Sequence, residues 1–286
     1  MNNANKYIKI SFANNVFLTL IKLFFGYISK SKTLIADGVH CASDMLTDII
    51  GYIGNVISSK KPDVNHPFGH GKAEYITSIF ISIFIIILSI KIFINSFTPT
   101  YKIDNYYILL ISFISIVTKY FISNLLIKKG KILNSNILVT SGTESKYDVL
   151  SSAFAFVFIL LSFYQDKCSL LKYADTIGSI VISIMTFKVG ISLFILNFNS
   201  SLGEVDIEKE SKNNIKNVLC KYKEIKNIRR ITILKYGTYR MLIIDIEVNG
   251  RMSINKFYEL DQKIKYDIKS LYKEYKYINI NVRPKK

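Results

Sequence analysis

The chain has 286 residues, of which 50% are hydrophobic, and its formal net charge is +17. So many apolar residues exclude a disordered chain and leave two classes, a soluble protein with a large core or a membrane protein with several spans. Much of the positive charge follows residue 203, where there are 20 Lys and Arg and 11 Asp and Glu. A basic tail beside a membrane domain is typical of a cytoplasmic segment near anionic lipid headgroups. We therefore expect no nucleic-acid partner.

Long apolar segments recur along the first 200 residues and then stop. Residues 75–98 carry a single charge, Lys91, and residues 149–164 carry none. A bilayer core about 30 Å thick takes roughly 20 apolar residues at the helical rise. A soluble helical bundle is disfavoured because residues 79–90 have no polar face. The pattern therefore predicts six transmembrane helices, over residues 8–29, 33–58, 73–98, 104–128, 136–164 and 173–198.

The loops between these spans predict the orientation. An even number of spans places both ends of the chain on one side of the membrane. Lysines are more frequent near the N-terminus and in the second and fourth loops than in the other three loops, which predicts cytoplasmic N- and C-termini. The first apolar run leads directly into further spans, so we expect an integral protein of the cell membrane without a cleavable signal peptide.

The second predicted span carries four ionisable side chains, Asp37, His40, Asp44 and Asp48. Charges inside a membrane span are costly, so each of them is a candidate for function. The last three follow one another at intervals of four residues and therefore share one helical face. The three cysteines, Cys41, Cys168 and Cys220, lie far apart in the sequence with no paired spacing. We therefore expect neither a disulfide framework nor a cysteine metal site.

The connection after this span reads DVNHPFGHGKAE and contains Asp63, His66 and His70. Pro67 and Gly69 lie between the two histidines, so a continuous helix is not expected there. A tight loop that presents two imidazoles and a carboxylate is a candidate second metal site near the cytoplasmic face. The alternative is that these residues only shape and cap the turn into the third span. All three histidines of the chain lie in this loop or the second span, which favours ligand roles.

The fifth predicted span carries Glu144 and Asp148, again four residues apart. If the second and fifth spans pack together, these acids reach the level of His40 and Asp44. One imidazole and three carboxylates suffice for four-coordinate binding of a divalent cation. The alternative is that the groups neutralise one another or pair with Lys146. Because Lys146 lies two residues from both acids, roughly on the opposite face, the metal interpretation is favoured.

From residue 203 onward the pattern is that of a small folded domain. Gly237-Thr238 predicts a hairpin turn, and Pro284 is expected to end the last strand. Helix, strand, strand, helix and strand are expected in that order, over residues 206–222, 228–236, 239–248, 254–275 and 277–282. This order fits an α+β sandwich with helices on one face of a short sheet. We therefore expect a six-span transport domain over residues 1–200 and a cytoplasmic domain over residues 203–286.

Three strings, SKTLIADGVHCASDMLTD, NHPFGHGKAE and ESKYD, resemble the cation diffusion facilitator family of metal–proton antiporters, and the resemblance covers nearly the whole chain. It implies efflux of a divalent metal ion, bound as substrate and not as a resident cofactor, and no enzymatic activity. The tail resembles the family's cytoplasmic dimerisation domain, with a ferredoxin-like, metallochaperone-like fold, which implies a homodimer. The implied transport site is His40, Asp44, Glu144 and Asp148, the implied loop site is Asp63, His66 and His70, and the structural motif is Gly69, Gly71 and Lys72.

One departure from the family pattern leaves the metal open. Glu144 stands where zinc exporters of the family commonly have a histidine. A carboxylate suits Mn²⁺, Fe²⁺ or Co²⁺ at least as well as Zn²⁺, whereas the imidazole of His40 favours Zn²⁺ and later metals.

Two further departures lie in or near the tail. The tail has no histidine, and Asp245 and Asn281 stand where zinc members of the family have two, so Asp245 is the candidate ligand there. Some members pair the lysine that matches Lys72 with an aspartate just after the sixth span. That stretch reads Asn199-Ser200-Ser201 here, so this ion pair is not expected.

Proton coupling follows from the chemistry of the ligands. A site for a divalent ion must be deprotonated to bind, so its affinity falls with pH, and His40 is a natural participant. A metal-gated channel or a non-transporting membrane sensor could use the same ligands; it would show flux that ignores a pH gradient, or binding without flux. A membrane metalloenzyme is disfavoured because no G-x-S-x-G or H-E-x-x-H string occurs.

Overall fold

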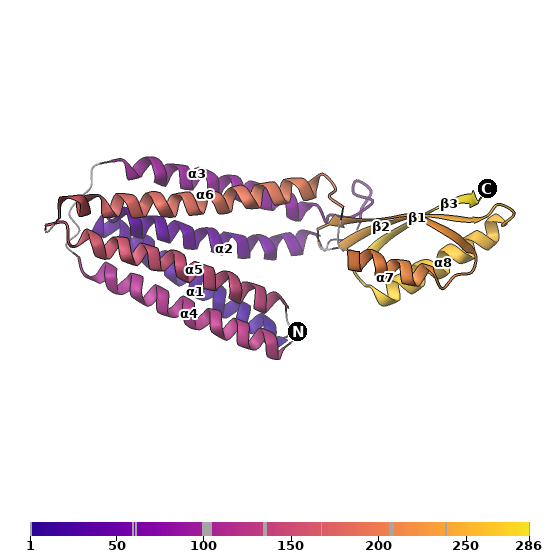
Figure 1. Ribbon diagram of the computed structural model, residues 1–286, viewed down its shortest axis with the longest axis horizontal. Coiled ribbons are helices and arrows are strands. Elements are labelled where there is room, and N and C mark those ends of the chain that lie inside the picture. The colour runs from indigo at the N-terminus through magenta and orange to yellow at the C-terminus, as the bar shows by residue number, and fades with distance from the viewer. Residues whose placement is uncertain are drawn as a thin grey trace. The chain divides into compact units, whose positions relative to one another are not determined.

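A computed structural model describes residues 2–58, 60, 62–98, 105–133, 136–166, 168–205, 209–237 and 239–285, with no description of the side chains at 2–5, 48, 50–55, 58, 136–137, 169 and 209. Six long helices come first, then a small α+β domain (Figure 1). The long helices are α1 (Asn2–Ser29), α2 (Lys32–Ser58), α3 (Ala73–Ser96), α4 (Tyr107–Ile132), α5 (Asn136–Ser162) and α6 (Ala174–Ser201), with a short 3₁₀ turn, η1 (Ser169–Tyr173), before α6.

The long helices confirm a polytopic α-helical membrane protein. Five of them, α1, α3, α4, α5 and α6, are long and apolar enough to cross a membrane. The sixth, α2, has 27 residues, about 40 Å at helical rise. It carries Asp37, His40, Asp44 and Asp48, the residues of this span for which the sequence predicts a function.

The N-terminal end of α2 is held by α6. Asp175, in the first turn of α6, accepts hydrogen bonds from the Ser31 hydroxyl (2.9 Å) and from the backbone N–H groups of Lys32 (2.8 Å) and Thr33 (3.0 Å). The first N–H groups of a helix have no partner within it, and a carboxylate beside them also offsets the positive end of the helix dipole. Asp175 is thus an N-terminal cap supplied by another helix.

Helices α4 and α5 form a close pair. The Ser123 hydroxyl donates to the Gly142 carbonyl at 2.7 Å. A Cβ at Gly142 would lie 2.9 Å from the backbone nitrogen of Ile127, so only glycine permits this approach. The contact places the C-terminal half of α4 beside the N-terminal half of α5, which also carries Asp148.

The tail has the predicted order of elements. Its sheet has the strand order β1-β2-β3, with β1 and β2 antiparallel and β2 and β3 parallel. The core joins both helices to the sheet and contains Ile215, Leu242, Ile264 and Ile268. The elements are α7 (Lys209–Leu219), β1 (Ile225–Tyr236), β2 (Tyr239–Asn249), α8 (Ile254–Leu271) and β3 (Tyr275–Lys285).

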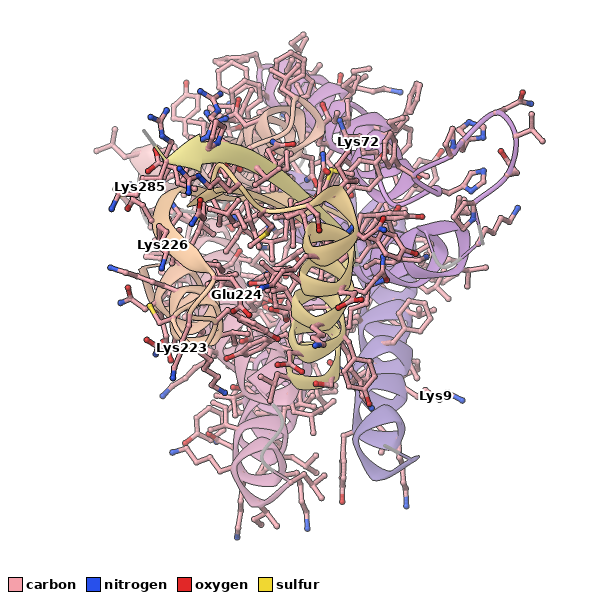
Figure 2. All side chains as sticks on the ribbon, turned by 90° about the vertical axis from the view of Figure 1, so that its right-hand side faces the viewer. Lys9, Lys72, Lys223, Glu224, Lys226 and Lys285 are labelled. Atoms are coloured by element: carbon pink, nitrogen blue, oxygen red, sulfur yellow. The ribbon has the colours of Figure 1, made fainter. Side chains whose placement is uncertain are left out.

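The last strand differs from the prediction, because β3 continues through Pro284 to Lys285. Pro284 pairs with Val248 of β2. Since β3 is an edge strand, the missing N–H of proline is tolerated there. Basic side chains such as Lys223, Lys226 and Lys285 are exposed on the tail (Figure 2).

The chain folds as two compact units, Met1–Ile49 with Phe80–Phe194, and Ile50–Ile79 with Ile195–Lys286. The first unit holds most of the long helices. The second holds the end of α2, the start of α3, the loop between them, the end of α6 and the tail. The division into domains at residues 200 and 203 stays a prediction.

Candidate metal centre

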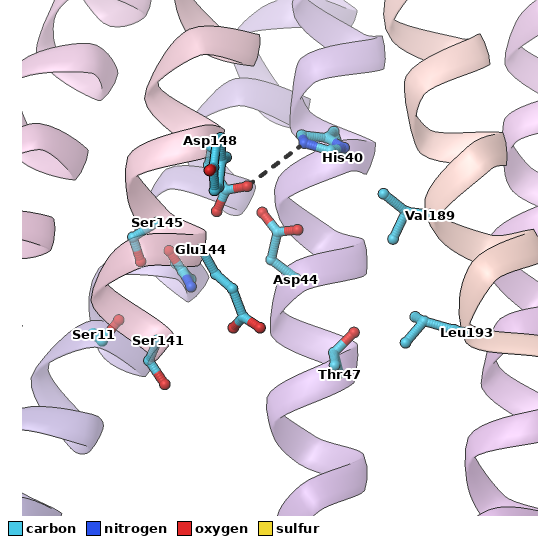
Figure 3. A pocket seen from close by; sticks show the side chains of 12 residues that line it. Ser11, His40, Asp44, Thr47, Ser141, Glu144, Ser145, Asp148, Val189 and Leu193 are labelled. Atoms are coloured by element: carbon cyan, nitrogen blue, oxygen red, sulfur yellow. Dashed lines mark ion pairs between the residues drawn. The ribbon is translucent and has the colours of Figure 1, made fainter. Parts of the chain in front are cut away.

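Three predicted ligands converge in the first unit. His40 and Asp44 on α2 and Asp148 on α5 offer ligand atoms that all lie within 4.8 Å of one another. The Nε2 atom of His40 is 3.9 Å from Oδ1 of Asp148 (Figure 3). The i, i+4 spacing on α2 places its two groups on one face, and α5 supplies the third. An imidazole and two carboxylates are a ligand set for a first-row divalent ion.

These groups line a pocket of about 290 Å³. Its other walls come from α1, α2, α5 and α6, and they include Ser11, Thr47, Ser141 and Leu193. These residues lie toward the N-terminal ends of α1 and α5 and the C-terminal ends of α2 and α6. Because successive spans run in opposite directions, all four ends are on the side of the membrane where the N-terminus lies.

Glu144 lines the same pocket but occupies a different level. It is one helical turn before Asp148, nearer the N-terminal end of α5, and its carboxylate points away from His40 (Figure 3). Among the described side chains, the convergent group contains the other three predicted ligands and not Glu144. The structure therefore brings three of the four side chains together and leaves the fourth on the wall of the pocket.

A buried lysine that the sequence analysis did not identify lies beside this group. The Lys119 ammonium, on α4, is 3.5 Å from Oδ2 of Asp44 and 3.7 Å from Oδ2 of Asp148. Its side chain is only 2% exposed. The signal for it was available, since a charge within an apolar span is a functional candidate.

His40 has a defined partner on the side away from Asp148. Its Nδ1 is 3.2 Å from the hydroxyl oxygen of Thr186 on α6, and that hydroxyl is 3.0 Å from the carbonyl of Ile182. Because the Thr186 proton goes to Ile182, its oxygen accepts from Nδ1–H of the neutral ring. This leaves Nε2 unprotonated, with its lone pair available to a metal beside Asp148.

Asp37, one of the functional candidates of the second predicted span and a possible accessory to the transport site, lies in a separate buried group. Its Oδ2 is 2.6 Å from the Lys22 ammonium, and both side chains are fully buried. Ser152 bridges the pair, accepting from Lys22 at 3.2 Å and donating to Asp37 at 3.2 Å. Lys22 is thus a second buried lysine that the sequence analysis missed. The prediction for Asp48 concerns a side chain outside the described residues.

The loop site is also assembled. Asp63, His66 and His70 offer ligand atoms within 4.8 Å of one another. Nδ1 of His66 is 3.0 Å from Oδ1 of Asp63, and Nε2 of His70 is 3.3 Å from Oδ2. The backbone N–H of His66 lowers the pKa of the Asp63 carboxyl below its usual value. Asp63 therefore stays a carboxylate to lower pH than an isolated aspartate does.

The glycines of the loop motif allow it to lie against the turn of the β1–β2 hairpin, within the second unit. A Cβ at Gly71 would overlap the Tyr236 carbonyl oxygen. Gly69 has φ +77° and Gly237 has φ +66°, a region that favours glycine. The Tyr239 hydroxyl donates to the Phe68 carbonyl. This close approach gives the glycines of the motif a structural function.

Lys72, the last residue of the motif, has no carboxylate opposite it at Asn199-Ser200-Ser201. Its ammonium donates to the Ser201 carbonyl at 2.9 Å and lies 5.4 Å from the centre of the Tyr236 ring. The contacts of Lys72 are therefore a backbone carbonyl and an aromatic face.

In the tail, Asp245 has a partner at each carboxylate oxygen. Oδ1 accepts from Asn281 at 2.8 Å and Oδ2 accepts from Arg230 at 3.0 Å. The hydrogen bond from Asn281 lowers the pKa of Asp245, and Arg230 adds to the effect. No third convergent metal-binding group occurs among the described side chains. A metal role for Asp245 stays a prediction.

Comparison with known proteins gives consistent matches along the chain. The cation efflux transmembrane domain matches residues 8–200, and the cytoplasmic domain of cation efflux proteins matches residues 207–285. The manganese efflux system protein MneP of Bacillus subtilis is 31% identical over 282 residues, which cover 96% of this chain and 94% of that protein. An uncharacterized transporter of Methanocaldococcus jannaschii is 28% identical over 99% of both chains.

Among solved structures, the metal-bound C-terminal domain of the CzcD transporter from Thermotoga maritima is 27% identical over 27% of this chain and 94% of that chain. The TM-score of that comparison is 0.26, which is too low to carry a structural argument.

Proposed function

Since this chain belongs to the cation efflux family, also called cation diffusion facilitators, it is an integral membrane protein for efflux of divalent metal ions, and we propose that it exports Mn²⁺ from the cytoplasm in exchange for protons. The observation that supports this most is the convergence of His40, Asp44 and Asp148 in one pocket. These three are proposed as direct ligands, with Glu144 as a further carboxylate one helical turn nearer the N-terminal end of α5.

The choice of Mn²⁺ rests on ligand chemistry and on the name of a relative. Carboxylates and water suit Mn²⁺, whereas a site with several imidazoles suits Zn²⁺ better. The pocket holds three carboxylates and one imidazole. MneP, with similarity along nearly its whole length, is named a manganese efflux protein. Zn²⁺, Fe²⁺ and Co²⁺ are the competing substrates.

We propose that the ion enters from the side of the pocket on which Glu144 lies. Lysine frequency in the loops predicts that the N-terminus and tail are cytoplasmic, and the match of the tail to a cytoplasmic domain supports this. The pocket residues Ser11, Thr47 and Glu144 are toward that side. Cytoplasmic ions would thus reach Glu144 before they reach His40, and the membrane concerned is proposed to be the cell membrane.

Proton exchange follows from the requirement that the ligands lose their protons before they bind metal. Metal loads where protons are scarce, and protons that arrive from the other side compete for the same oxygen and nitrogen atoms. The tail is proposed to form a homodimer, and the loop group of Asp63, His66 and His70 is proposed as a second metal site.

The test is transport by the purified protein in liposomes. We expect Mn²⁺ uptake that rises with an imposed pH gradient and collapses when an ionophore removes it. The same vesicles are given Zn²⁺, Fe²⁺ and Co²⁺ to rank the substrates. Uptake that ignores the gradient would indicate a channel, and binding without uptake would indicate a sensor; either outcome would replace the antiport proposal.

Thr186→Val is expected to weaken Mn²⁺ binding about tenfold, the lower end of the range for loss of a hydrogen bond that orients a ligand. The substitution removes the oxygen that accepts from Nδ1–H of His40, so the ring is free to place its proton on Nε2. Calorimetric titration of the purified protein measures the effect. Thr186→Ser, which keeps the oxygen, is the matched control. Equal affinity of the valine and serine variants would contradict the tautomer assignment.

A further inference from the structure

Lys119 lies beside the pocket, and the proposed transport chemistry gives this charged residue no role. It lies on α4, near the middle of the helix, and is almost fully buried. A lone buried charge in a span is costly, so such a residue is paired. Its partners are Asp44 and Asp148, at 3.5 and 3.7 Å. These carboxylates are the two proposed metal ligands that carry negative charge in the convergent group.

The position of the ammonium is close to where a metal ion would bind. A divalent ion bound to the same carboxylate oxygens has metal–oxygen distances of about 2 Å. Given the two Lys119 distances, such an ion would lie within about 6 Å of Nζ if the side chain did not move. Both are cations, and because the Lys119 side chain is almost fully buried, their charge repulsion is weakly screened. Charge repulsion therefore opposes the presence of the Lys119 ion pairs and of a bound metal ion at the same time.

We propose that Lys119 is a tethered cation that neutralises Asp44 and Asp148 in the empty site and is displaced from them by the metal ion. This rests on the proposed function of the pocket. The lysine sets a threshold for binding, because an incoming ion must interact with the carboxylates more strongly than the ammonium does. A doubly charged ion that accepts the imidazole of His40 meets this requirement, whereas a monovalent ion does not.

A purely structural lysine predicts the opposite result on substitution. If Lys119 only holds the carboxylates in place, then Lys119→Gln disorders them and weakens metal binding. If Lys119 competes with the metal, Lys119→Gln strengthens binding, because the ion no longer has to displace a charge. Lys119→Arg keeps the charge and separates the effect of charge from that of shape.

The experiment is calorimetric titration of Mn²⁺ into the full chain in detergent. His66 and His70 are replaced by Ala in every sample, so that binding reports the pocket. We expect Lys119→Gln to lower the Kd at least tenfold and Lys119→Arg to leave it within about threefold of the unsubstituted lysine. Lys91→Gln, which removes an exposed lysine of α3, is the matched control and is expected to change nothing.

An unchanged or higher Kd for Lys119→Gln would overturn the proposal. Failure of both Lys119→Gln and Lys119→Met to give a folded protein would also overturn it, because it would assign the lysine a structural role. Asp44→Ala distinguishes the two proposals. If Asp44→Ala binds Mn²⁺ as tightly as the unsubstituted pocket, the transport site itself is misassigned. If Asp44→Ala loses Mn²⁺ binding and Lys119→Gln does not strengthen Mn²⁺ binding, only the proposed role of Lys119 is wrong.

Discussion

Asp44→Asn is expected to lower the initial rate of pH-driven Mn²⁺ uptake in liposomes by at least about 100-fold. Loss of a group that merely orients a metal ligand typically costs 10–100-fold, and Asp44 is proposed as a direct ligand. The substitution keeps the shape of the side chain and removes its negative charge. It also leaves the Lys119 ammonium with Asp148 as its remaining partner among the proposed ligands. Both changes disfavour entry of a second cation.

Two further variants make this result specific. Asp166→Asn neutralises an exposed carboxylate in the connection after α5 and is expected to transport at the normal rate. Asp148→Asn, on the other helix of the convergent group, is expected to behave like Asp44→Asn. Gradient-driven uptake by Asp44→Asn at the rate of the unsubstituted protein would exclude the convergent group as the transport site.

Of the single substitutions described here, Asp37→Ala is expected to lower thermal stability most, because it leaves Lys22 fully buried without a counter-charge. Removing one partner of a buried ion pair costs about 3–5 kcal/mol. The remaining contacts of the Lys22 ammonium, Cys41 and Ser152, are uncharged. The measurement is the midpoint of loss of the monodisperse peak when detergent-solubilised protein is heated before size-exclusion chromatography.

The double variant Lys22→Met with Asp37→Leu is expected to recover most of that loss, since replacing a whole buried pair by apolar groups is often neutral. Recovery shows that the unpaired charge causes the defect, and not the missing carboxylate as such. Glu274→Ala, which breaks the partly exposed pair with Arg240 in the tail, is the control and should cost no more than about 1 kcal/mol. A stable Asp37→Ala protein would contradict this assignment.

The fold was predictable because its signals are local. Apolar runs long enough for a bilayer fix α1 and α3–α6, and alternation around Gly237 fixes the β1–β2 hairpin. The end of β3 was not predictable in the same way. Whether proline ends a strand depends on which strands are its neighbours, and Pro284 is tolerated because β3 has β2 on one side alone.

The candidate site was predictable in part for the same reason. Spacing of four residues determines that His40 and Asp44 share a face of α2, but it also separates them by one turn, about 6 Å along the helix axis. Two such pairs on crossing helices do not all meet at one point. The crossing brings Asp148 to the α2 pair and leaves Glu144 one turn away. The crossing angle is a tertiary property that the spacing does not contain.

The buried lysines were visible as charges but not as partners. The sequence shows that the first and fourth spans each carry a lysine near the middle. It does not show that Lys22 meets Asp37 and that Lys119 meets Asp44 and Asp148. Each of these contacts joins different helices, so identifying them requires knowledge of which helices pack together.

Because Asp175 caps its first turn, α2 is held at its N-terminal end. Asp44 lies 12 residues beyond Lys32, about 18 Å along the helix. If α2 tilts by about 10° around the end that Asp175 holds, Asp44 moves by about 3 Å, more than the length of a metal–oxygen bond of about 2 Å. His40 is nearer the fixed end and moves less. A rigid tilt of one helix is therefore enough to separate Asp44 from Asp148, with every backbone hydrogen bond of the helix intact.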